Sequence, residues 1–272
     1  MIISSYNPTY TFTSTREEKR SYHKFSLRKT FEFSILWYLY IRNFLGENED
    51  ILLIDQNADY PIEDFLNKIN ENCDISSNLN YEFDLRTKLH IKKFKDKAYP
   101  LKGIKRLYQY MFRFCYHNNL DFFYIENDCL IAKNFVKISE GYDFVTNTIN
   151  LHERVCDTYI NFIKISRLKE HDSFMNFIDY LDLLNKYDEN LSLLEEKDFD
   201  PSLDVVYSLT NERGIYIKYC YGNVLCLNWD GIYHQGSNEE LIQFLEKNPI
   251  NHPFYEYFLE NGKKIINEIQ NQ

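Results

Sequence analysis

Glycine and proline are scarce in this sequence, with eight and six among 272 residues, so we expect no flexible linker to divide the chain. Long apolar runs are missing as well. The most apolar helical segment, Phe31–Leu45, is too short and too often interrupted by polar residues to cross a bilayer, and we expect no transmembrane segment. These absences predict a single domain spanning residues 1–272.

Cysteine is present, but its spacing gives no sign of a CxxC motif or a zinc site. The six cysteines form no CxxC pair and no zinc-binding pattern. They lie in apolar segments, where a reduced cysteine acts as a small hydrophobic side chain. Free thiols fit a reducing compartment, and we expect a cytoplasmic protein. The cysteines are at positions 73, 115, 129, 156, 220 and 226.

Positively charged residues are in the minority: the chain has 31 Lys and Arg residues and 41 Asp and Glu residues, which give a formal net charge of −10. Non-specific nucleic-acid binding needs a basic surface, so we expect no nucleic-acid partner. The hydrophobic content of 44%, with 17% aromatic residues, is enough to bury a large core. An acidic protein of this kind needs a local basic patch or a cation to hold a phosphorylated ligand.

An aromatic and β-branched stretch at residues 120–131, LDFFYIENDCLI, is the most informative part of the chain. Its run Phe122–Ile125 is typical of a central strand covered on both faces. Residues two apart in a strand point to the same side, so Glu126 and Asp128 can reach one point while Asn127 turns the chain. Two hard oxygen ligands this close suit Mg²⁺ or Mn²⁺. The alternative is an ordinary polar turn with local backbone hydrogen bonds.

The first half of the chain has the element order of an α/β protein. Residues 1–8 predict a short strand that stops at an Asn-Pro turn. Residues 50–55 predict a second, buried strand, followed by an acidic loop and a helix at residues 62–72. Ligands of such sheets bind beyond the carboxyl ends of the strands, where Asp55 lies, so we predict that it contacts a nucleoside. A turn or capping role is the alternative.

Basic residues gather between positions 86 and 106, interrupted only by Asp96. A charge run of this kind is most often a solvated face. Its second half merges with an amphipathic helix at residues 101–115, which leads directly into the acidic stretch. Lys102 and Arg106 lie near the start of that helix, where cations and a helix N-terminus can meet an anion.

Taken in order, the Ser-Tyr-Asn-Pro strand, the strand that ends at Asp55, the basic helix and FFYIENDCLI resemble a GT-A-fold glycosyltransferase with a variant DxD motif. The resemblance implies an α/β fold with a mixed, Rossmann-like central sheet flanked by helices. It also implies Mn²⁺ or Mg²⁺ at Glu126 and Asp128, bound to a nucleoside-diphosphate sugar. Because the first acid is Glu rather than Asp, direct and water-mediated binding both stay open for Glu126.

The same resemblance implies a division of labour along the chain. Residues 1–135 would bind the sugar nucleotide, and residues 136–272, with C-terminal helices at 239–247 and 252–269, would bind the acceptor. The residues that would contact the donor are Ser5, Tyr6, Asn7, Asp55, Lys102, Arg106 and Asn127.

Two later segments are similar to family 2 glycosyltransferases and related metal-dependent enzymes. Residues 202–216 resemble the helix whose first acidic residue is the general base toward the acceptor hydroxyl, and Asp204 is the matching position. A helix N-cap is the alternative role for Asp204. Residues 224–236 resemble the strand and His-x-Gly turn that supply a third metal contact, here His234. Imidazole suits Mn²⁺ better than Mg²⁺.

The segments between these motifs have simpler interpretations. Strands are predicted at residues 141–146 and 158–168, and a helix at 172–185. The acidic segment 187–200 is either a solvated loop or a lid over the acceptor.

These patterns predict a metal-dependent glycosyltransferase that moves a sugar from a nucleoside-diphosphate sugar to a hydroxyl of a glycan or other glycoconjugate. With Asp204 as general base the transfer would be inverting, although the His-x-Gly turn also occurs in retaining families. One alternative is a nucleotidyltransferase with a similar core, but no glycine-rich phosphate loop follows the first strand. The other is an inactive GT-A fold that binds a glycan or scaffolds a partner. No pattern specifies the oligomeric state.

Overall fold

The computed structural model describes residues 1–14, 25–46, 49–72, 88–95, 100–146, 149–150, 155–156, 160–169 and 223–270. The strands are β1 (Ile2–Tyr6), β2 (Ile51–Asp55), β3 (Leu89–Lys93), β4 (Phe122–Ile125), β5 (Cys129–Ile131), β6 (Phe144–Thr146), β7 (Ile149–Asn150), β8 (Val155–Cys156), β9 (Ile160–Ile163), β10 (Val224–Cys226) and β11 (Ile232–His234). The helices are η1 (Leu27–Lys29), α2 (Phe31–Leu45), α3 (Ile62–Asn72), α4 (Pro100–Asn118), α5 (Phe135–Ile138), α6 (Ile165–Lys169), α10 (Asn238–Lys247) and α11 (Pro253–Gln270).

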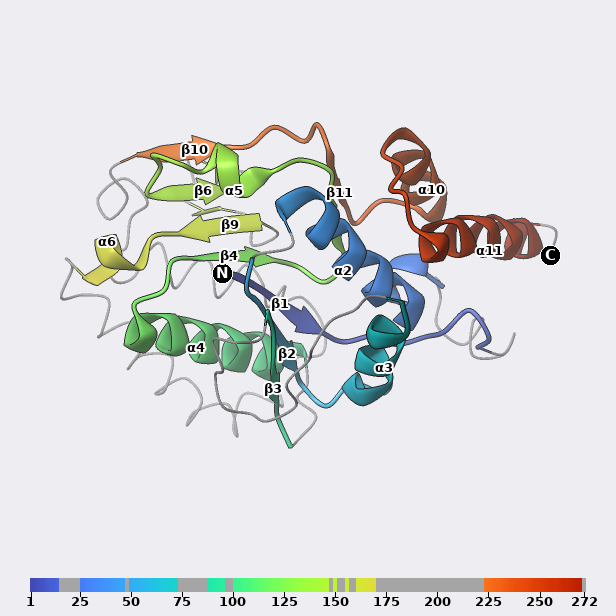
Figure 1. Ribbon diagram of the computed structural model, residues 1–272, viewed down its shortest axis with the longest axis horizontal. Coiled ribbons are helices and arrows are strands. Elements are labelled where there is room, and N and C mark those ends of the chain that lie inside the picture. Colours follow the sequence, from blue (N-terminus) through green and yellow to red (C-terminus); the bar gives the residue numbers. More distant parts are fainter. Residues whose placement is uncertain are drawn as a thin grey trace. The chain divides into compact units, whose positions relative to one another are not determined.

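Seven of these strands form one mixed sheet in the order β10-β6-β9-β4-β1-β2-β3 (Figure 1). The pairs β1 with β4, β6 with β10, and β2 with β3 are parallel. Strand β9 is antiparallel to both of its neighbours, β4 and β6. The predicted α/β class with a mixed central sheet is therefore confirmed.

The chain forms two compact units, each assembled from segments that are far apart in the sequence. The first unit comprises Met1–Ile3, Asp96–Glu126 and Val136–Asn228. The second unit comprises Ser4–Lys95, Asn127–Phe135 and Trp229–Gln272. The assignment of residues 1–135 to the donor and residues 136–272 to the acceptor stays a prediction.

In the first unit, the predicted amphipathic helix is α4, and it packs against strand β4. The helix buries Leu107, Met111, Phe112 and Cys115, which recur at helical spacing along one side. The ring of Phe112 meets the ring of Phe122 edge-on, with centroids 5.6 Å apart. Aromatic packing between the helix and the strand thus holds the residues that lead into the acidic turn.

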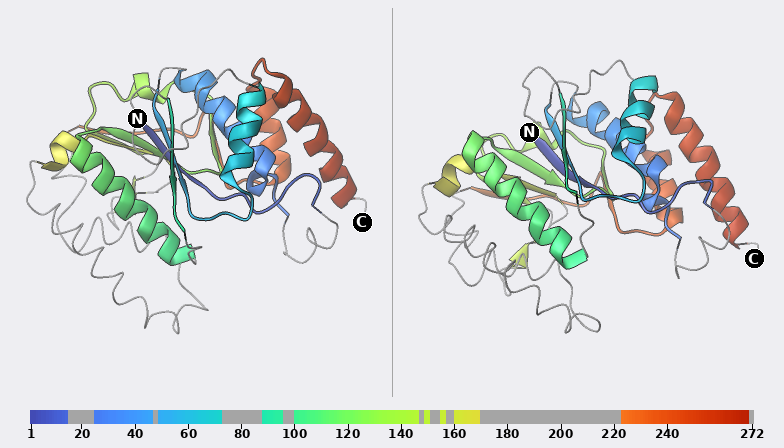
Figure 2. Two further views of the ribbon diagram at one scale, coloured as in Figure 1. Left: turned by 60° about the horizontal axis from the view of Figure 1, so that its bottom comes forward. Right: turned by 90° about the horizontal axis from the view of Figure 1, so that it is seen from below.

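Helix α2 is the buried centre of the second unit. Its N-cap is Thr30, whose hydroxyl accepts a hydrogen bond from the Phe33 N–H at 3.1 Å. Every residue from 35 to 41 is buried, so the helix is covered on several sides rather than along one stripe. It packs against α3, α11 and β5. Helices α10 and α11 contact each other and run side by side in both views of Figure 2.

Strand β3 lies in the basic window and is not predicted from the sequence. Leu89, His90 and Ile91 are buried in it, and the strand pairs with β2 in a register that puts Lys93 beside Asp55. A solvated face is therefore the wrong interpretation for residues 89–91. The chain alternates basic and apolar residues there, and pairing with a buried strand covers the apolar ones.

The strand predicted at 158–168 is wrong in its second half, because β9 ends at Ile163 and the helix α6 occupies residues 165–169. The strand predicted at 141–146 is confirmed at residues 144–146, as β6. The helix predicted at 62–72 is α3, and those predicted at 239–247 and 252–269 are α10 and α11. The segments 172–185, 187–200 and 202–216 lie outside the described residues. Among the described helices, none has the length and apolar character that a membrane crossing requires. Cys115, Cys129 and Cys226 are free, as expected.

Candidate metal centre

The acidic residues predicted to bind a metal lie in a turn between two buried strands. Strand β4 ends at Ile125, Asn127 and Asp128 form the turn, and β5 begins at Cys129. The prediction that strand alternation brings the two carboxylates together is therefore wrong. The turn brings them together instead, and both Glu126 and Asp128 are half-buried next to fully buried strands.

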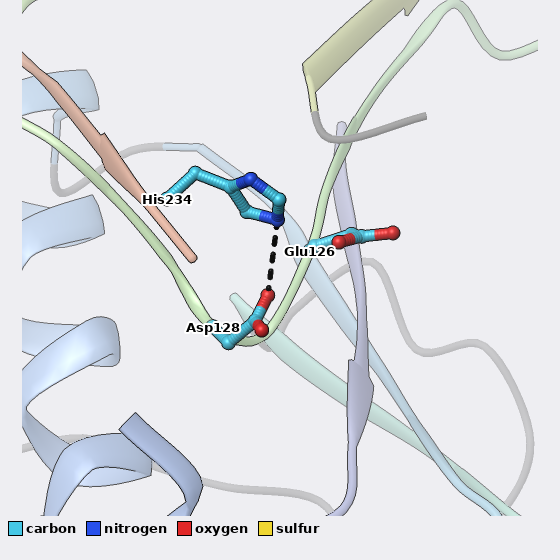
Figure 3. Close-up of side chains that lie close together, drawn as sticks. All are labelled: Glu126, Asp128 and His234. Carbon is cyan, nitrogen blue, oxygen red and sulfur yellow. Dashed lines mark ion pairs between the residues drawn. The ribbon is translucent and has the colours of Figure 1, made fainter. Parts of the chain in front are cut away.

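Strand pairing places His234 beside this turn. Strands β5 and β11 are antiparallel, and their register sets His234 opposite Cys129, the residue that follows Asp128. Nε2 of His234 consequently lies 3.6 Å from Oδ1 of Asp128, and Figure 3 shows the two side chains pointing toward each other. The His234 side chain is only 3% exposed, so the surrounding packing fixes its orientation.

The turn that follows His234 leaves no space for a side chain at its glycine. Gln235 has a positive φ of 52°, and a Cβ at Gly236 would lie 2.7 Å from Oε2 of Glu240 and 2.8 Å from Cε2 of Tyr233. The Tyr233 hydroxyl donates a hydrogen bond to the Gly236 carbonyl at 2.9 Å, and burial raises the pKa of Tyr233 above its ordinary value. The His-x-Gly spacing therefore has a packing reason in this chain.

Glu126, Asp128 and His234 together fit a divalent cation. Each offers one ligand atom, and these atoms lie within 4.8 Å of one another. Octahedral ligands held about 2.1 Å from an ion are about 3 to 4 Å apart, so small side-chain adjustments would bring all three into contact with one ion. Carboxylate oxygens with one imidazole nitrogen form a donor set that suits Mn²⁺. This agrees with the predicted cluster.

Arg28 also lies at this site, although no sequence pattern predicts it there. Its Nη1 donates a hydrogen bond to Oδ2 of Asp128 at 2.5 Å, and the two side chains are 17% and 18% exposed. Each carboxylate oxygen of Asp128 therefore faces a basic group, Oδ2 facing Arg28 and Oδ1 facing His234. Arg28 lies 100 positions before Asp128, and no local pattern marks it as a site residue.

The backbone around Arg28 is attached to the start of helix α10. The Leu27 N–H donates to Oδ1 of Asn238 at 2.8 Å, and Nδ2 of Asn238 donates to the Phe25 carbonyl at 3.2 Å. Asn238 is the first residue of α10, which begins shortly after His234. The segment of residues 234–238 therefore helps to position both basic residues of the site: it contains His234, and its Asn238 holds the backbone next to Arg28.

Of the residues predicted to contact the sugar nucleotide, Ser5 and Asn127 are in contact with each other, whereas Tyr6 and Asn7 do not join them. The Ser5 hydroxyl donates to Oδ1 of Asn127 at 3.2 Å, which ties the end of β1 to the acidic turn. Tyr6 is buried, and its hydroxyl donates to the Pro61 carbonyl at 3.4 Å. Burial raises the pKa of Tyr6 above its ordinary value. Tyr6 thus contributes to the core, and Asn7 is exposed.

Asp55 is buried at the carboxyl end of β2, with 1% of its surface exposed. Its Oδ1 accepts a hydrogen bond from the Ala58 N–H at 2.9 Å, which is the turn contact considered as the alternative to nucleoside binding. Burial raises the pKa of Asp55, against the opposing effects of the Ala58 hydrogen bond and the Lys93 charge. The turn role is thus present in the structure, and a nucleoside contact stays a prediction.

A basic hollow of about 420 Å³ lies where β3 ends. Phe94 provides an aromatic surface, with Nζ of Lys92 5.3 Å from its ring centroid. Nζ of Lys93 is hydrogen-bonded to Glu63 at 2.8 Å, and this bond lowers the pKa of Glu63. The lining residues are Asn57, Lys92, Lys93, Phe94 and Lys95. The end of the unpredicted strand β3 and the two residues that follow it therefore form most of this hollow.

Three other predicted site residues are not brought to this cluster by the described contacts. Lys102 and Arg106 lie on α4, in the first unit; Arg106 is half-buried, and the side chain of Lys102 is outside the described part of the structure. Asp204 also lies outside the described residues. The roles predicted for these three residues stay predictions.

Neither a family model nor a curated protein matches the chain. Among solved structures, residues 1-349 of S. aureus TarS in complex with UDP are similar, with 10% identity over 95% of this chain and 70% of that chain and a TM-score of 0.45. Galactosyltransferase LgtC in complex with donor and acceptor sugar analogues gives 7% identity over 95% and 99% of the two chains and a TM-score of 0.46. A nucleoside-diphosphate-sugar pyrophosphorylase from Vibrio cholerae RC9 gives 12% identity over 90% and 100% and a TM-score of 0.44. Because these TM-scores are below 0.5, we base the function on the side chains of the site.

Proposed function

We propose that the chain is a metal-dependent glycosyltransferase of the GT-A type. It would transfer a sugar from a nucleoside-diphosphate sugar to a hydroxyl group of a glycan or other glycoconjugate. The observation that supports this proposal is the convergence of Glu126, Asp128 and His234 at the end of the buried strand β4. Ligands of open α/β sheets bind beyond the carboxyl ends of the strands, which is where this turn lies.

The turn residues would bind and orient the diphosphate end of the donor. A divalent cation held by Glu126, Asp128 and His234 would neutralise the charge that develops on the leaving diphosphate. His234 is almost fully buried and Asp128 is 18% exposed, so both present their ligand atoms with little freedom. The Ser5 hydrogen bond to Asn127 supports the turn from β1 and restrains its backbone.

The hollow at the end of β3 is suited to the nucleoside end of the donor. Its lysines provide positive charge for an anionic ligand, and Phe94 offers an apolar ring surface. Asp55, at the end of the neighbouring strand β2, would accept a hydrogen bond from a ribose hydroxyl or a base. Both strands belong to the second unit, as do Asp128 and His234.

Chemistry at the acceptor would depend on Asp204. In this proposal Asp204 takes the proton from the acceptor hydroxyl as its oxygen bonds to the anomeric carbon, and the bond from that carbon to the diphosphate oxygen breaks. This step inverts the configuration of the sugar. Lys102 and Arg106 would add positive charge toward the departing diphosphate.

The proposal is tested by hydrolysis and transfer assays with a panel of sugar nucleotides, with and without Mn²⁺. We expect turnover that requires Mn²⁺ and is lost in Asp128→Asn and His234→Ala. Asp230→Asn is the matched control, because Asp230 lies between β10 and β11 but pairs with Lys133 at 2.6 Å outside the cluster. If both site variants keep wild-type turnover and Mn²⁺ dependence, the metal-site assignment is wrong.

The products separate this function from its two alternatives. A glycosyltransferase releases a nucleoside diphosphate, whereas a nucleotidyltransferase consumes or releases inorganic pyrophosphate. A scaffold protein would show no turnover and no thermal shift with nucleoside diphosphates and Mn²⁺, because only a ligand that binds the native state raises the melting temperature. Pyrophosphate exchange, or a complete lack of turnover and shift, would overturn the proposal.

A further inference from the structure

Arg28 occupies a position that matters for any cation at Asp128. Its Nη1 lies 2.5 Å from Oδ2 of Asp128, with both side chains less than a fifth exposed. A charge-assisted hydrogen bond of this length is strong, and water screens it only partly. A metal ion that coordinates Asp128 would bring a second positive centre to the same carboxylate, so the guanidinium and the metal ion compete for it.

The guanidinium of Arg28 also has hydrogen-bonding capacity left over. Arginine carries five N–H donors in a planar fork. Within the part of the chain that the structure describes, the buried Nε of Arg28 has no hydrogen-bond partner. A buried donor in this state costs free energy, and a phosphate oxygen is well suited to accept from it.

From these two observations we propose that Arg28 exchanges partners when the donor binds. Without a cation, its guanidinium holds the Asp128 carboxylate; with the cation and a diphosphate present, it leaves Oδ2 and donates to a phosphate oxygen. Arg28 is then a diphosphate-binding residue of the site and a built-in competitor of the metal ion. This inference rests on the proposed function, since it assumes that the cluster takes a metal ion and a diphosphate.

The attachment of the Arg28 segment makes such an exchange local. Leu27 and Phe25 are bonded through their backbones to Asn238, so the backbone on the N-terminal side of Arg28 is anchored while the long side chain can rotate. Thr30, two residues later, is buried and caps α2. Only the side chain of Arg28 needs to move for its guanidinium to change partners.

Two binding measurements on the full chain test the exchange, and neither depends on activity. The first is Mn²⁺ affinity without any phosphate ligand, measured by electron paramagnetic resonance. The second is the affinity for inorganic pyrophosphate at saturating Mg²⁺, measured by calorimetry. The proteins are the wild type, Arg28→Gln, Arg28→Lys and the control Lys29→Gln, which removes a neighbouring exposed charge.

The proposal predicts opposite changes in the two affinities. Arg28→Gln should bind Mn²⁺ several-fold more tightly, because the competing charge is gone, and pyrophosphate about tenfold more weakly, the effect of losing one hydrogen bond to a charged group. Arg28→Lys should fall between Arg28→Gln and the wild type, and Lys29→Gln should match the wild type. Circular dichroism and thermal melting confirm that each variant is folded.

The outcomes that contradict the exchange differ from those that contradict the proposed function. If Arg28→Gln weakens Mn²⁺ and pyrophosphate binding together, Arg28 only supports Asp128 and the exchange is wrong. Unchanged affinities for both probes would also overturn it. If neither the wild type nor Arg28→Gln binds Mn²⁺ at all, the metal site itself fails, and the proposed function fails with it.

Discussion

Oδ1 of Asp128 and Nε2 of His234 lie 3.6 Å apart because the residue after Asp128 is paired with His234 across two antiparallel strands. The backbone ladder between β5 and β11 therefore sets the distance between the two side chains. An acidic turn and a histidine that are distant in the sequence become one site through a three-residue strand pairing.

This relationship predicts that Asp128 and His234 act as a pair in metal binding. Asp128→Asn and His234→Ala should each remove most of the Mn²⁺ affinity, and the double variant should bind only slightly more weakly than either single variant. The expected coupling in the double-mutant cycle is about 1–2 kcal/mol, as for groups that share one ligand. Mn²⁺ titration by electron paramagnetic resonance measures it. Losses that simply add would show that the two residues bind independently.

Asp55 should make stability depend on pH in a particular direction. Burial raises its pKa in the folded state above the ordinary value near 3.8. Its contribution to stability is fully present below that value, where the carboxyl is neutral, and is lost as pH rises through the folded pKa. Asp55→Asn does not titrate and retains an oxygen that accepts from the Ala58 N–H. The melting temperature of the wild type relative to Asp55→Asn should therefore fall between pH 4 and pH 7.

The control for this prediction is Asp59→Asn, since Asp59 is an exposed carboxylate in the same loop. Its melting curve should follow that of the wild type across the same pH range. If the wild type gains stability relative to Asp55→Asn as pH rises, the Asp55 carboxylate is favoured in its ionised form and burial does not dominate its pKa.

Gly231 should tolerate alanine less well than a comparable glycine elsewhere. Its φ is +78°, and an added Cβ would lie 2.9 Å from Cγ of Lys133. Gly141 has a φ of +87° but nothing within 4 Å of its Cβ position. Both substitutions should cost about 1 kcal/mol for the left-handed backbone, and Gly231→Ala should cost more because of the contact. Urea unfolding measures the difference, and Lys133→Ala should reduce it. Equal costs would contradict the contact.

Asn238 should be more important for stability than other helix-surface asparagines. Its side chain accepts from the Leu27 N–H and donates to the Phe25 carbonyl, and both of these residues are buried. Asn238→Ala removes both of these hydrogen bonds, and we expect a loss of about 2 kcal/mol in the free energy of unfolding. Asn261→Ala is the control, because among the described residues the Asn261 side chain donates to the Tyr257 carbonyl in its own exposed helix turn. A similar small loss in both variants would contradict the anchoring role.

The elements that the sequence predicts well are those with a clear local signal. The helix at 62–72 and the strand that ends at Asp55 follow from hydrophobic periodicity and turn residues, which act over a few positions. Strand β3 is missed because its lysines dominate the local pattern. The burial of Leu89 and Ile91 depends on pairing with β2, which no local window contains.

The site residues likewise differ in how well the local sequence predicts them. Glu126 and Asp128 stand out because carboxylates follow a buried apolar strand. His234 is recognised only through its resemblance to a His-x-Gly turn, and the strand register then explains its position. No local sequence pattern marks Arg28, because its contact with Asp128 depends on the packing of η1 against α10.

The pairing of β5 with β11 also has a consequence for synthesis in the cell. β5 is completely buried, and its hydrogen-bonding edge is covered by a strand that the ribosome makes about 100 residues later. At about 5–20 residues per second, the apolar stretch Cys129–Ile131 waits roughly 5–20 s for its partner. Until residues 232–234 are made, this edge is open, and an open strand edge is a place where another chain can pair and aggregate.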